Sequence, residues 1–148
     1  MAYHYVDSGL DNVYLENGYT EHETAYGKGL SIQDTEGLHK IIGEWLVSLP
    51  KPLNGAELRF LRLEMEMTQR NLAGVFASTE QNVRRWEKAR DRAIPGPADR
   101  LLRVLYCEYV GGDGSVRAIV DRLAELDQVE YADACFSDDP EEGWRIAA

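Results

Sequence analysis

Short apolar runs alternate with polar residues in the first part of the chain, which is the pattern of half-buried strands. Residues 13–16 (Val-Tyr-Leu-Glu) and 19–22 (Tyr-Thr-Glu-His) form two such runs on either side of Asn17-Gly18. Asn-Gly is a strong hairpin signal, because both central residues of that turn need positive φ. The pattern therefore predicts a β-hairpin over 13–22, and a further strand is expected within 24–32.

Apolar residues then recur every three or four positions, as they do in an amphipathic helix. This spacing predicts a helix from about residue 35 to 48 that stops before Pro50. Its apolar positions are Leu38, Ile41, Ile42, Trp45, Leu46 and Leu49. Together with Trp45, the tyrosines of this region either form a sheet core against the helix or a binding surface; they are Tyr3, Tyr5, Tyr14, Tyr19 and Tyr26.

Between residues 55 and 110 the apolar positions repeat in four shorter groups, which predict four helices. Thr68 is the candidate N-cap of the second helix, and Ser78 or Thr79 that of the third. Pro97 opens the fourth. The apolar positions of the four are Leu58, Leu61 and Met65; Leu72, Val75 and Phe76; Val83 and Trp86; and Leu101, Leu102, Leu105 and Tyr106. A fifth helix is expected from about 115 to 127, on the stripe Val116, Ile119, Val120, Leu123 and Leu126.

Charge divides the chain near its proline- and glycine-rich joints. The 148 residues carry 26 acidic and 16 basic side chains, a net charge of −10. Residues 1–54 hold 8 acids and 3 bases, residues 55–110 hold 8 and 10, and residues 111–148 hold 10 and 3. The middle segment is therefore the one suited to a polyanion. We predict a small α+β N-terminal domain (1–54) for partner binding or dimerisation, a helical domain (55–110), and a C-terminal helix with an acidic tail (111–148).

Composition narrows the class of protein. Hydrophobic residues make up 44% of the chain, which is typical of a globular protein. No apolar run is long enough to span a membrane, and the N-terminus has no pattern of an export signal. Cys107 and Cys135 are therefore interpreted as reduced thiols, and we expect a cytoplasmic, nucleoid-associated protein.

Neither a metal site nor an enzyme is expected. His4, His22 and His39 lie 18 and 17 residues apart, without the i,i+4 spacing or cysteine pairs of a metal site. There is no nucleophile elbow and no cluster of acid, base and nucleophile. We therefore expect no cofactor.

The most informative stretch runs from residue 68 to 88. Residues 68–76 (TQRNLAGVF) and 80–88 (EQNVRRWEK) predict two helices, joined by a three-residue turn (AST). Small Ala73 lets the helices approach, and their facing apolar residues are Leu72, Phe76, Val83 and Trp86. The exposed face of the second helix then carries side chains that pair with base edges and phosphates, namely Gln81, Asn82, Arg84 and Arg85.

This stretch resembles the helix-turn-helix of the Xre/Cro family of DNA-binding regulators, whose core reads roughly T-Q-x-x-L-A-x-x-x-G-V-S-x-x-x-V-x-x-W-E-x-G. Ala77, Ser78 and Ala89 depart from it, at the turn glycine, the next apolar residue and the final glycine. An alanine with positive φ is mildly strained, so the turn either carries that strain or takes another shape. The matching positions are Thr68, Gln69, Leu72, Ala73, Thr79, Val83, Trp86 and Glu87.

The resemblance implies a mainly α fold, in which a five-helix Xre/Cro-like domain follows the α+β N-terminal domain with its β-hairpin. It also implies roles for individual residues. Gln81 and Arg85 would read bases in the major groove, Asn82 and Arg84 would contact phosphates or flanking positions, and Gln69 would contact a phosphate. Glu80 would accept from a cytosine amine or cap the helix, and Lys88 completes the DNA-binding set. Arg62 and Glu87 would form a structural ion pair, with Trp86 in the core.

A wider resemblance, to antitoxins of the MqsA type, rests on the order of the segments. An aromatic-rich N-terminal segment, Leu38-His39 and a helix precede the motif, and Pro97 with Leu-Leu-Arg-Val-Leu follows it. The zinc-binding Cys-x-x-Cys pairs of those antitoxins are absent, so zinc is not carried over.

We interpret the protein as a sequence-specific DNA-binding transcriptional repressor and order three possible functions by preference. The first is an antitoxin that represses its own promoter on double-stranded DNA and captures a toxin protein with its N-terminal domain. The second is a stand-alone repressor whose N-terminal domain dimerises or senses a ligand or partner. The third is a protein-interaction module that has lost DNA binding, which the net charge of −10 favours.

A homodimer is expected, because one such helix reads few bases and two copies on a two-fold operator double the readout. The dimer surface is expected on the last helices, over 97–109 or 115–127. Its candidate residues, which could also pack within one chain, are Val116, Ile119, Val120 and Leu123. The acidic tail from Asp133 to Glu142 is predicted to be disordered and solvated, or to fold back on the basic helices and weaken non-specific DNA binding.

Overall fold

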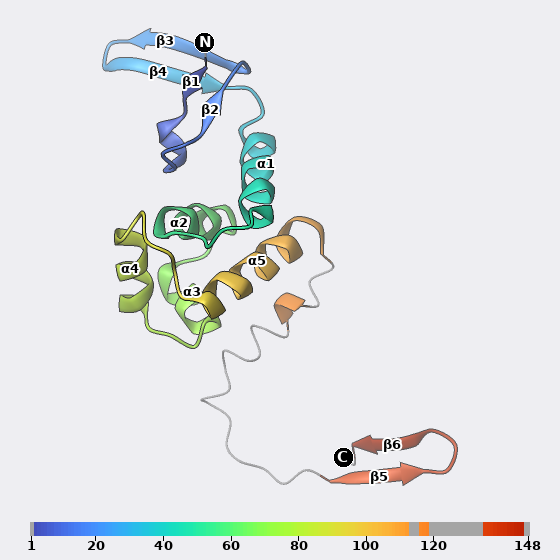
Figure 1. Cartoon of the computed structure of the whole chain (residues 1–148). Helices are drawn as coiled ribbons and strands as arrows, with labels where there is room; N and C mark the ends of the chain where they lie inside the picture. The colour runs from blue at the N-terminus through green and yellow to red at the C-terminus, as the bar shows by residue number, and fades with distance from the viewer. Residues whose placement is uncertain (1, 113–115, 119–134, 147–148) are drawn as a thin grey trace.

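The computed structural model describes residues 2–112, 116–118 and 135–146 (Figure 1). Near the N-terminus, β1 (Tyr3–His4) pairs antiparallel with β2 (Tyr14–Leu15), and the short 3₁₀ helix η1 (Val6–Ser8) lies between them. β3 (Tyr19–Thr24) and β4 (Gly27–Ile32) form a second antiparallel pair. These described segments thus hold separate two-stranded sheets instead of one larger sheet.

The prediction of a β-hairpin over residues 13–22 is wrong. Leu15 pairs with Tyr3 and Tyr19 pairs with Ile32, so the two predicted strands belong to different sheets. Of the two turn residues, only Gly18 has positive φ (79°), whereas a type I′ turn requires it at both. The physical reason is burial. Leu15 packs in the core together with Tyr5, which directly follows β1, and this packing brings β2 beside β1.

The hairpin that does form closes over Ala25 and Tyr26, between β3 and β4. The Thr24 hydroxyl supports this turn, because it donates to the Gly27 carbonyl (2.7 Å) and accepts from the Tyr26 N–H (3.2 Å). The further strand expected within 24–32 is present as β4. Of the aromatic set, Tyr5 is buried and Tyr3 and Tyr19 pack against the core, whereas Tyr14, Tyr26 and Trp45 are exposed.

The helix expected from 35 to 48 is confirmed as α1 (Thr35–Ser48). Asp34 caps it by accepting from the Gly37 N–H (3.1 Å). α1 lies against α2 and α5, and its contact with α5 depends on Gly43. A Cβ at Gly43 would lie 2.1 Å from the Tyr106 hydroxyl oxygen, so any side chain there would displace the Tyr106 ring.

The four short helices of the middle segment are also present. They are α2 (Gly55–Glu64), α3 (Gln69–Val75), α4 (Glu80–Lys88) and α5 (Gly96–Gly111), gathered at one end of α1 (Figure 1). Thr68 caps α3 and Thr79 caps α4, each accepting from the N–H three residues later. Asn54 and Glu57 form a capping box at the start of α2.

The buried side chains form one hydrophobic cluster that includes residues on both sides of Asn54. The division into three domains stays a prediction. The largest fully buried side chains are Leu46, Leu53, Leu58, Leu61, Leu72, Val83, Leu102, Leu105 and Tyr106. Among the described residues no helix is long and apolar enough to cross a membrane.

At the C-terminal end, β5 (Phe136–Asp139) and β6 (Gly143–Ile146) pair antiparallel. The prediction of a disordered acidic tail is therefore wrong for these residues. Gly143 (φ 83°) and the Asp139 carboxylate, which accepts from the N–H groups of Glu141 and Glu142, close the turn.

Of the fifth helix expected over 115–127, the structure describes residues 116–118, which are helical. Val116 packs against the core, which is the intramolecular alternative for that residue. The other dimer candidates, Ile119, Val120 and Leu123, lie outside the described residues.

Candidate nucleic-acid interface

α3 and α4 are joined by a turn in which Ala77 has positive φ (53°). The Ser78 N–H donates to the Ala73 carbonyl (2.8 Å), and the Ala77 N–H donates to the Gly74 carbonyl (3.2 Å). These two bonds are the Schellman pattern, which satisfies the last carbonyls of a helix and usually places glycine at the left-handed position. The turn thus keeps the shape that a glycine would give and carries alanine's strain.

Apolar packing and one close backbone approach hold α4 against the rest of the helical cluster. Val83 is fully buried, and the rings of Trp86 and Phe76 lie 6.3 Å apart. Gly55 lies beneath the end of α4, where a Cβ would come within 2.0 Å of the Trp86 carbonyl oxygen. The opposite face of α4 is consequently left to solvent.

A buried ion pair links α2 to α4. The Arg62 guanidinium donates from Nε to Glu87 Oε2 (2.7 Å) and from Nη2 to Glu87 Oε1 (2.9 Å). Its Nη1 donates to the Met67 carbonyl (3.0 Å), and both charged residues are buried. The structure thus brings together the two residues that the sequence paired. Such a bidentate contact fixes the orientation of α4 on α2.

Gln69 belongs to the same network. Its amide Nε2 donates to Glu87 Oε1 (3.2 Å), so this side chain, predicted to contact a phosphate, lies against the ion pair. In this arrangement Gln69 ties the start of α3 to α4.

The exposed face of α4 carries four polar side chains at positions i, i+3, i+4 and i+7, namely Gln81, Arg84, Arg85 and Lys88. That spacing places them on one stripe of the helix. Three of the four are cationic at neutral pH, and all of them are hydrogen-bond donors. This stripe, which we call the α4 stripe, can therefore offer donors to acceptor atoms on bases or phosphates.

The other DNA-binding candidates on α4, Asn82 and Glu80, make hydrogen bonds to neighbouring residues of the same segment. Asn82 is half-buried and donates to the Ser78 hydroxyl (3.0 Å), while its carbonyl oxygen accepts from Arg85 Nη2 (2.7 Å). Glu80 accepts from Arg84 Nη2 (3.3 Å). Both arginines are thus held along the helix surface by polar neighbours on α4 itself.

Sequence reasoning missed one contact beside the stripe. Arg90, just after α4, donates to the Gly9 carbonyl (2.8 Å) and to the Asp11 carboxylate (2.9 Å). The N-terminal segment therefore contacts the chain at the end of α4. The partners lie about eighty residues apart in the sequence, so no local pattern could indicate this contact.

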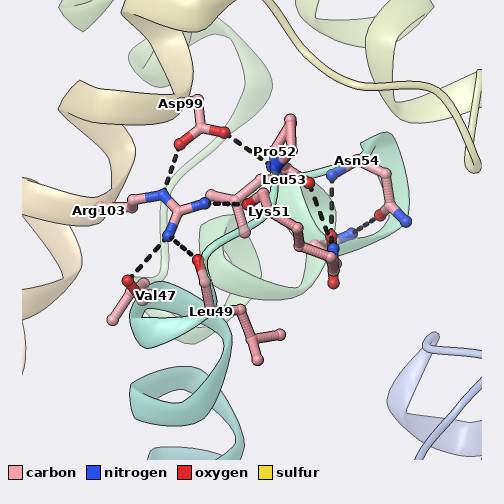
Figure 2. A network of polar contacts seen from close by, with 9 residues as sticks. Val47, Leu49, Lys51, Pro52, Leu53, Asn54, Asp99 and Arg103 are labelled. Atoms are coloured by element: carbon pink, nitrogen blue, oxygen red, sulfur yellow. Dashed lines mark hydrogen bonds and ion pairs between the residues drawn. The ribbon is translucent and has the colours of Figure 1, made fainter.

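It also missed the network that joins α1 to α5 (Figure 2). Arg103 lies between the Asp99 carboxylate and the carbonyls of Val47, Leu49 and Lys51, at the end of α1 and just after it. The other Asp99 oxygen accepts from the Leu53 N–H (2.7 Å). The one available signal was the Asp–Arg spacing of four residues on a helix.

This network sets the protonation of Asp99. Burial on its own would raise the pKa of the carboxyl group. Hydrogen bonds from Arg103 and the Leu53 N–H, with the charges of Arg103 and Arg100, outweigh it and lower the pKa of Asp99 below its ordinary value. Asp99 is therefore a carboxylate at neutral pH.

Two buried tyrosines complete the polar contacts between α1 and its neighbours. The Tyr5 hydroxyl lies 2.8 Å from His39 Nε2, and the other ring nitrogen of His39 lies 2.7 Å from Glu64. Burial, followed by nearby carboxylates, raises the pKa of Tyr5. Burial likewise raises the pKa of Tyr106 to about 12, and its hydroxyl donates to the Lys40 carbonyl (3.2 Å). Both hydroxyls stay protonated, and each makes a structural hydrogen bond.

Comparison with known proteins returned no matching family model, no matching curated protein and no matching solved structure.

Proposed function

We propose that this protein binds double-stranded DNA sequence-specifically through α4 and regulates transcription, with its own promoter as the first operator to test. An α-helix fits the major groove of B-DNA, where each base pair presents a distinct pattern of donors and acceptors. In this proposal the α4 stripe enters the groove, Gln81 and Arg85 read bases, and Arg84 and Lys88 contact phosphates.

The observation that carries the proposal is the division of α4 into two faces. Val83 and Glu87 are buried against α2 and α3, while the α4 stripe is exposed along the whole helix. The helix is anchored from its inner face by the bidentate Arg62–Glu87 pair, which touches none of the stripe residues. Such an arrangement presents a rigid set of donors, as base readout needs.

The distribution of charge along the chain also supports DNA binding through α4. Residues 55–110 have an excess of basic residues within a chain whose net charge is −10. An acidic protein is repelled by DNA unless its cations are segregated on one surface. The α4 stripe supplies such a surface, and its resemblance to the Xre/Cro recognition helix gives the stripe its assigned roles.

The test is a fluorescence anisotropy titration of the full chain against a duplex from its own upstream region, with an unrelated duplex as competitor. Arg85→Ala should weaken operator binding by about 1–3 kcal/mol and relax selectivity at one base pair. Arg85→Lys keeps the charge but loses the fork that binds guanine in a bidentate manner, so it should lose selectivity and keep most non-specific binding.

Lys28→Ala is the matched control, because it removes one exposed positive charge from β4, outside α4. It should leave operator affinity unchanged. If Arg85→Ala kept the affinity and selectivity of the parent protein while its circular dichroism spectrum stayed native, the assignment of α4 to the groove would be wrong.

A further inference from the structure

The C-terminal hairpin has one aromatic face. In an antiparallel pair, residues directly opposite each other share a face, and side chains alternate along each strand. The register pairs Asp138 with Trp144 and places Phe136 on the same face, two residues along β5. Both rings are exposed, Phe136 by 63% and Trp144 by 74%. An isolated two-stranded hairpin is only marginally stable in water, so a partner that covers these rings would stabilise it.

The chemistry of this face fits a guanidinium group. Trp144 and Phe136 offer π-faces that attract cations, and the Asp138 carboxylate on the same face can accept bidentate hydrogen bonds. Within the described parts of the chain, no hydrogen bond or ion pair engages the Asp138 carboxylate. The one arginine of the hairpin, Arg145, lies on the opposite face with Ser137 (3.4 Å) and Asp139 (3.9 Å).

The turn adds negative charge to the hairpin. Hydrogen bonds from the N–H groups of Glu141 and Glu142 lower the pKa of Asp139, which keeps that carboxylate ionised. With Asp138, Asp139, Glu141 and Glu142 against Arg145, the hairpin carries a clear excess of negative charge.

The same chain presents the complementary surface on α4. Arg84 and Arg85 are adjacent and exposed, and Lys88 follows one turn later on the same stripe. The Arg84–Glu80 ion pair and the Arg85–Asn82 hydrogen bond both lie on the surface, where such contacts are weak and readily exchanged for another partner. The α4 stripe is thus a cationic face with two guanidinium groups available for aromatic and carboxylate ligands.

We propose that the C-terminal hairpin docks the face formed by the rings of Phe136 and Trp144 and the carboxylate of Asp138 on the arginines of the α4 stripe in the same chain. Both surfaces belong to one polypeptide, so the contact gains from a high effective concentration that a separate partner lacks. The contact needs no DNA, whereas its consequence, competition with DNA for α4, rests on the proposed function. A duplex that makes base contacts would displace the hairpin, and one that offers only phosphates would do so less well.

The contact is tested first without DNA. Amide signals of α4 in the ¹⁵N-labelled full chain are compared by NMR between the parent protein, Asp138→Lys and Trp144→Ala. We expect the signals of residues 80–88 to shift in both variants and to stay in place in Ser137→Ala, which changes the opposite face of β5. Asp138→Lys leaves both rings and the turn intact. It therefore still tests the contact if Trp144→Ala unfolds the hairpin.

Unmoved α4 signals in Asp138→Lys would overturn the proposal. It would also be overturned if the shifts vanished on dilution, because the contact would then join two chains. The charge exchange Arg85→Glu with Asp138→Arg should restore the contact that either change alone removes, and failure to restore it would argue against a direct pairing.

The consequence for DNA is tested separately, with an unrelated duplex at low salt. Asp138→Lys should bind it about threefold more tightly or better, and Ser137→Ala should bind it as the parent protein does. Asp138→Lys also changes the net charge by two. The double variant Lys28→Glu with Asp138→Lys restores the parent's net charge and should keep the gain in DNA affinity.

If no variant binds DNA while the NMR shifts are present, the proposed function fails and the docking stands. If DNA binding is present but does not change, the competition is disproved.

Discussion

Ala77 takes a left-handed conformation (φ 53°) at the position that closes the α3–α4 turn. A Cβ in this region clashes with the backbone and costs about 1–2 kcal/mol, whereas glycine adopts it freely. Glycine also has more freedom to lose on folding, which offsets part of the gain. We therefore expect Ala77→Gly to raise the free energy of unfolding by about 0.5–1 kcal/mol, measured as a higher urea midpoint at an unchanged m-value.

Ala89 provides the control for this prediction, because the motif that the segment resembles has glycine at both positions. Ala89 has φ −82°, so glycine offers no relief there. Ala89→Gly should lower stability by a few tenths to about 1 kcal/mol. Equal stabilisation by both changes would show that backbone strain at Ala77 is not the cause.

Asp99 makes stability depend on pH through its hydrogen bonds to Arg103 and Leu53. Its folded-state pKa is lowered from 3.8, so between the two values the unfolded chain binds more protons than the folded one. The stabilisation is therefore complete above the unfolded value and is lost as pH falls through the folded value. Asp99→Asn should cost about 2 kcal/mol at pH 6 and should lose less further stability on acidification than the parent protein, by urea denaturation at several pH values.

Asp91→Asn is the matched change at an exposed carboxylate in the segment between α4 and α5. It should leave stability at pH 6 within about 0.5 kcal/mol of the parent. If Asp99→Asn followed the parent protein's acid profile throughout, the network of Figure 2 would contribute nothing to the pH dependence.

At the scale of elements, the packing of α2 on α4 depends on the absence of a side chain at Gly55. A Cβ there would lie 2.0 Å from the Trp86 carbonyl oxygen and 2.8 Å from that of Ala89, both of which are backbone atoms that cannot rotate away. Gly55→Ala should therefore lower the free energy of unfolding by about 2–3 kcal/mol, despite alanine's higher helix propensity. Thermal or urea denaturation measures the change.

Gly111, in the last turn of α5, is the control because a Cβ there meets nothing within 4 Å. Gly111→Ala should be neutral or stabilise by up to about 1 kcal/mol. If Gly55→Ala were as neutral as Gly111→Ala, the close approach of α2 and α4 would be contradicted.

The helices could be predicted from the sequence because their signals are local. The spacing of Leu38, Ile42 and Leu46 and the caps Thr68 and Thr79 act within a few residues, and all of them are realised. Strand pairing is set by partners at a distance, so Asn17-Gly18 suggested a hairpin that the burial of Leu15 against β1 overrides. The C-terminal hairpin was missed because its acidic composition outweighed the alternation of its strands.

The candidate site divides in the same way. The exposed face of α4 follows from helical periodicity once Val83 is recognised as buried, so its residues could be named from the sequence. The partners of Gln69 and Arg90 depend on how α2, α4 and the N-terminal segment are packed, and no spacing along the chain indicates them. The Arg103 network is missing from the sequence interpretation for the same reason.

At the scale of the whole molecule, the proposed DNA affinity depends on local cations that overcome a net charge of −10. Each phosphate neutralised on a duplex lowers the slope of log affinity against log salt by about 0.9. Lys88 is exposed at the end of the α4 stripe, and its ammonium group makes no hydrogen bond or ion pair among the described residues. Lys88→Ala should therefore make the slope shallower by about 1 per bound chain and weaken binding to all duplexes alike, since phosphate contacts carry no sequence information.

The measurement is a set of anisotropy titrations between about 50 and 200 mM salt, with the upstream duplex and an unrelated one. Lys28→Ala removes the same charge from β4 and should leave the slope unchanged. If both variants flattened the slope equally, net charge and not the α4 stripe would govern the interaction. If only Lys88→Ala did so while Arg85→Ala removed selectivity, phosphate contact and base reading would be separated on one helix face, as the placement of these residues along α4 requires.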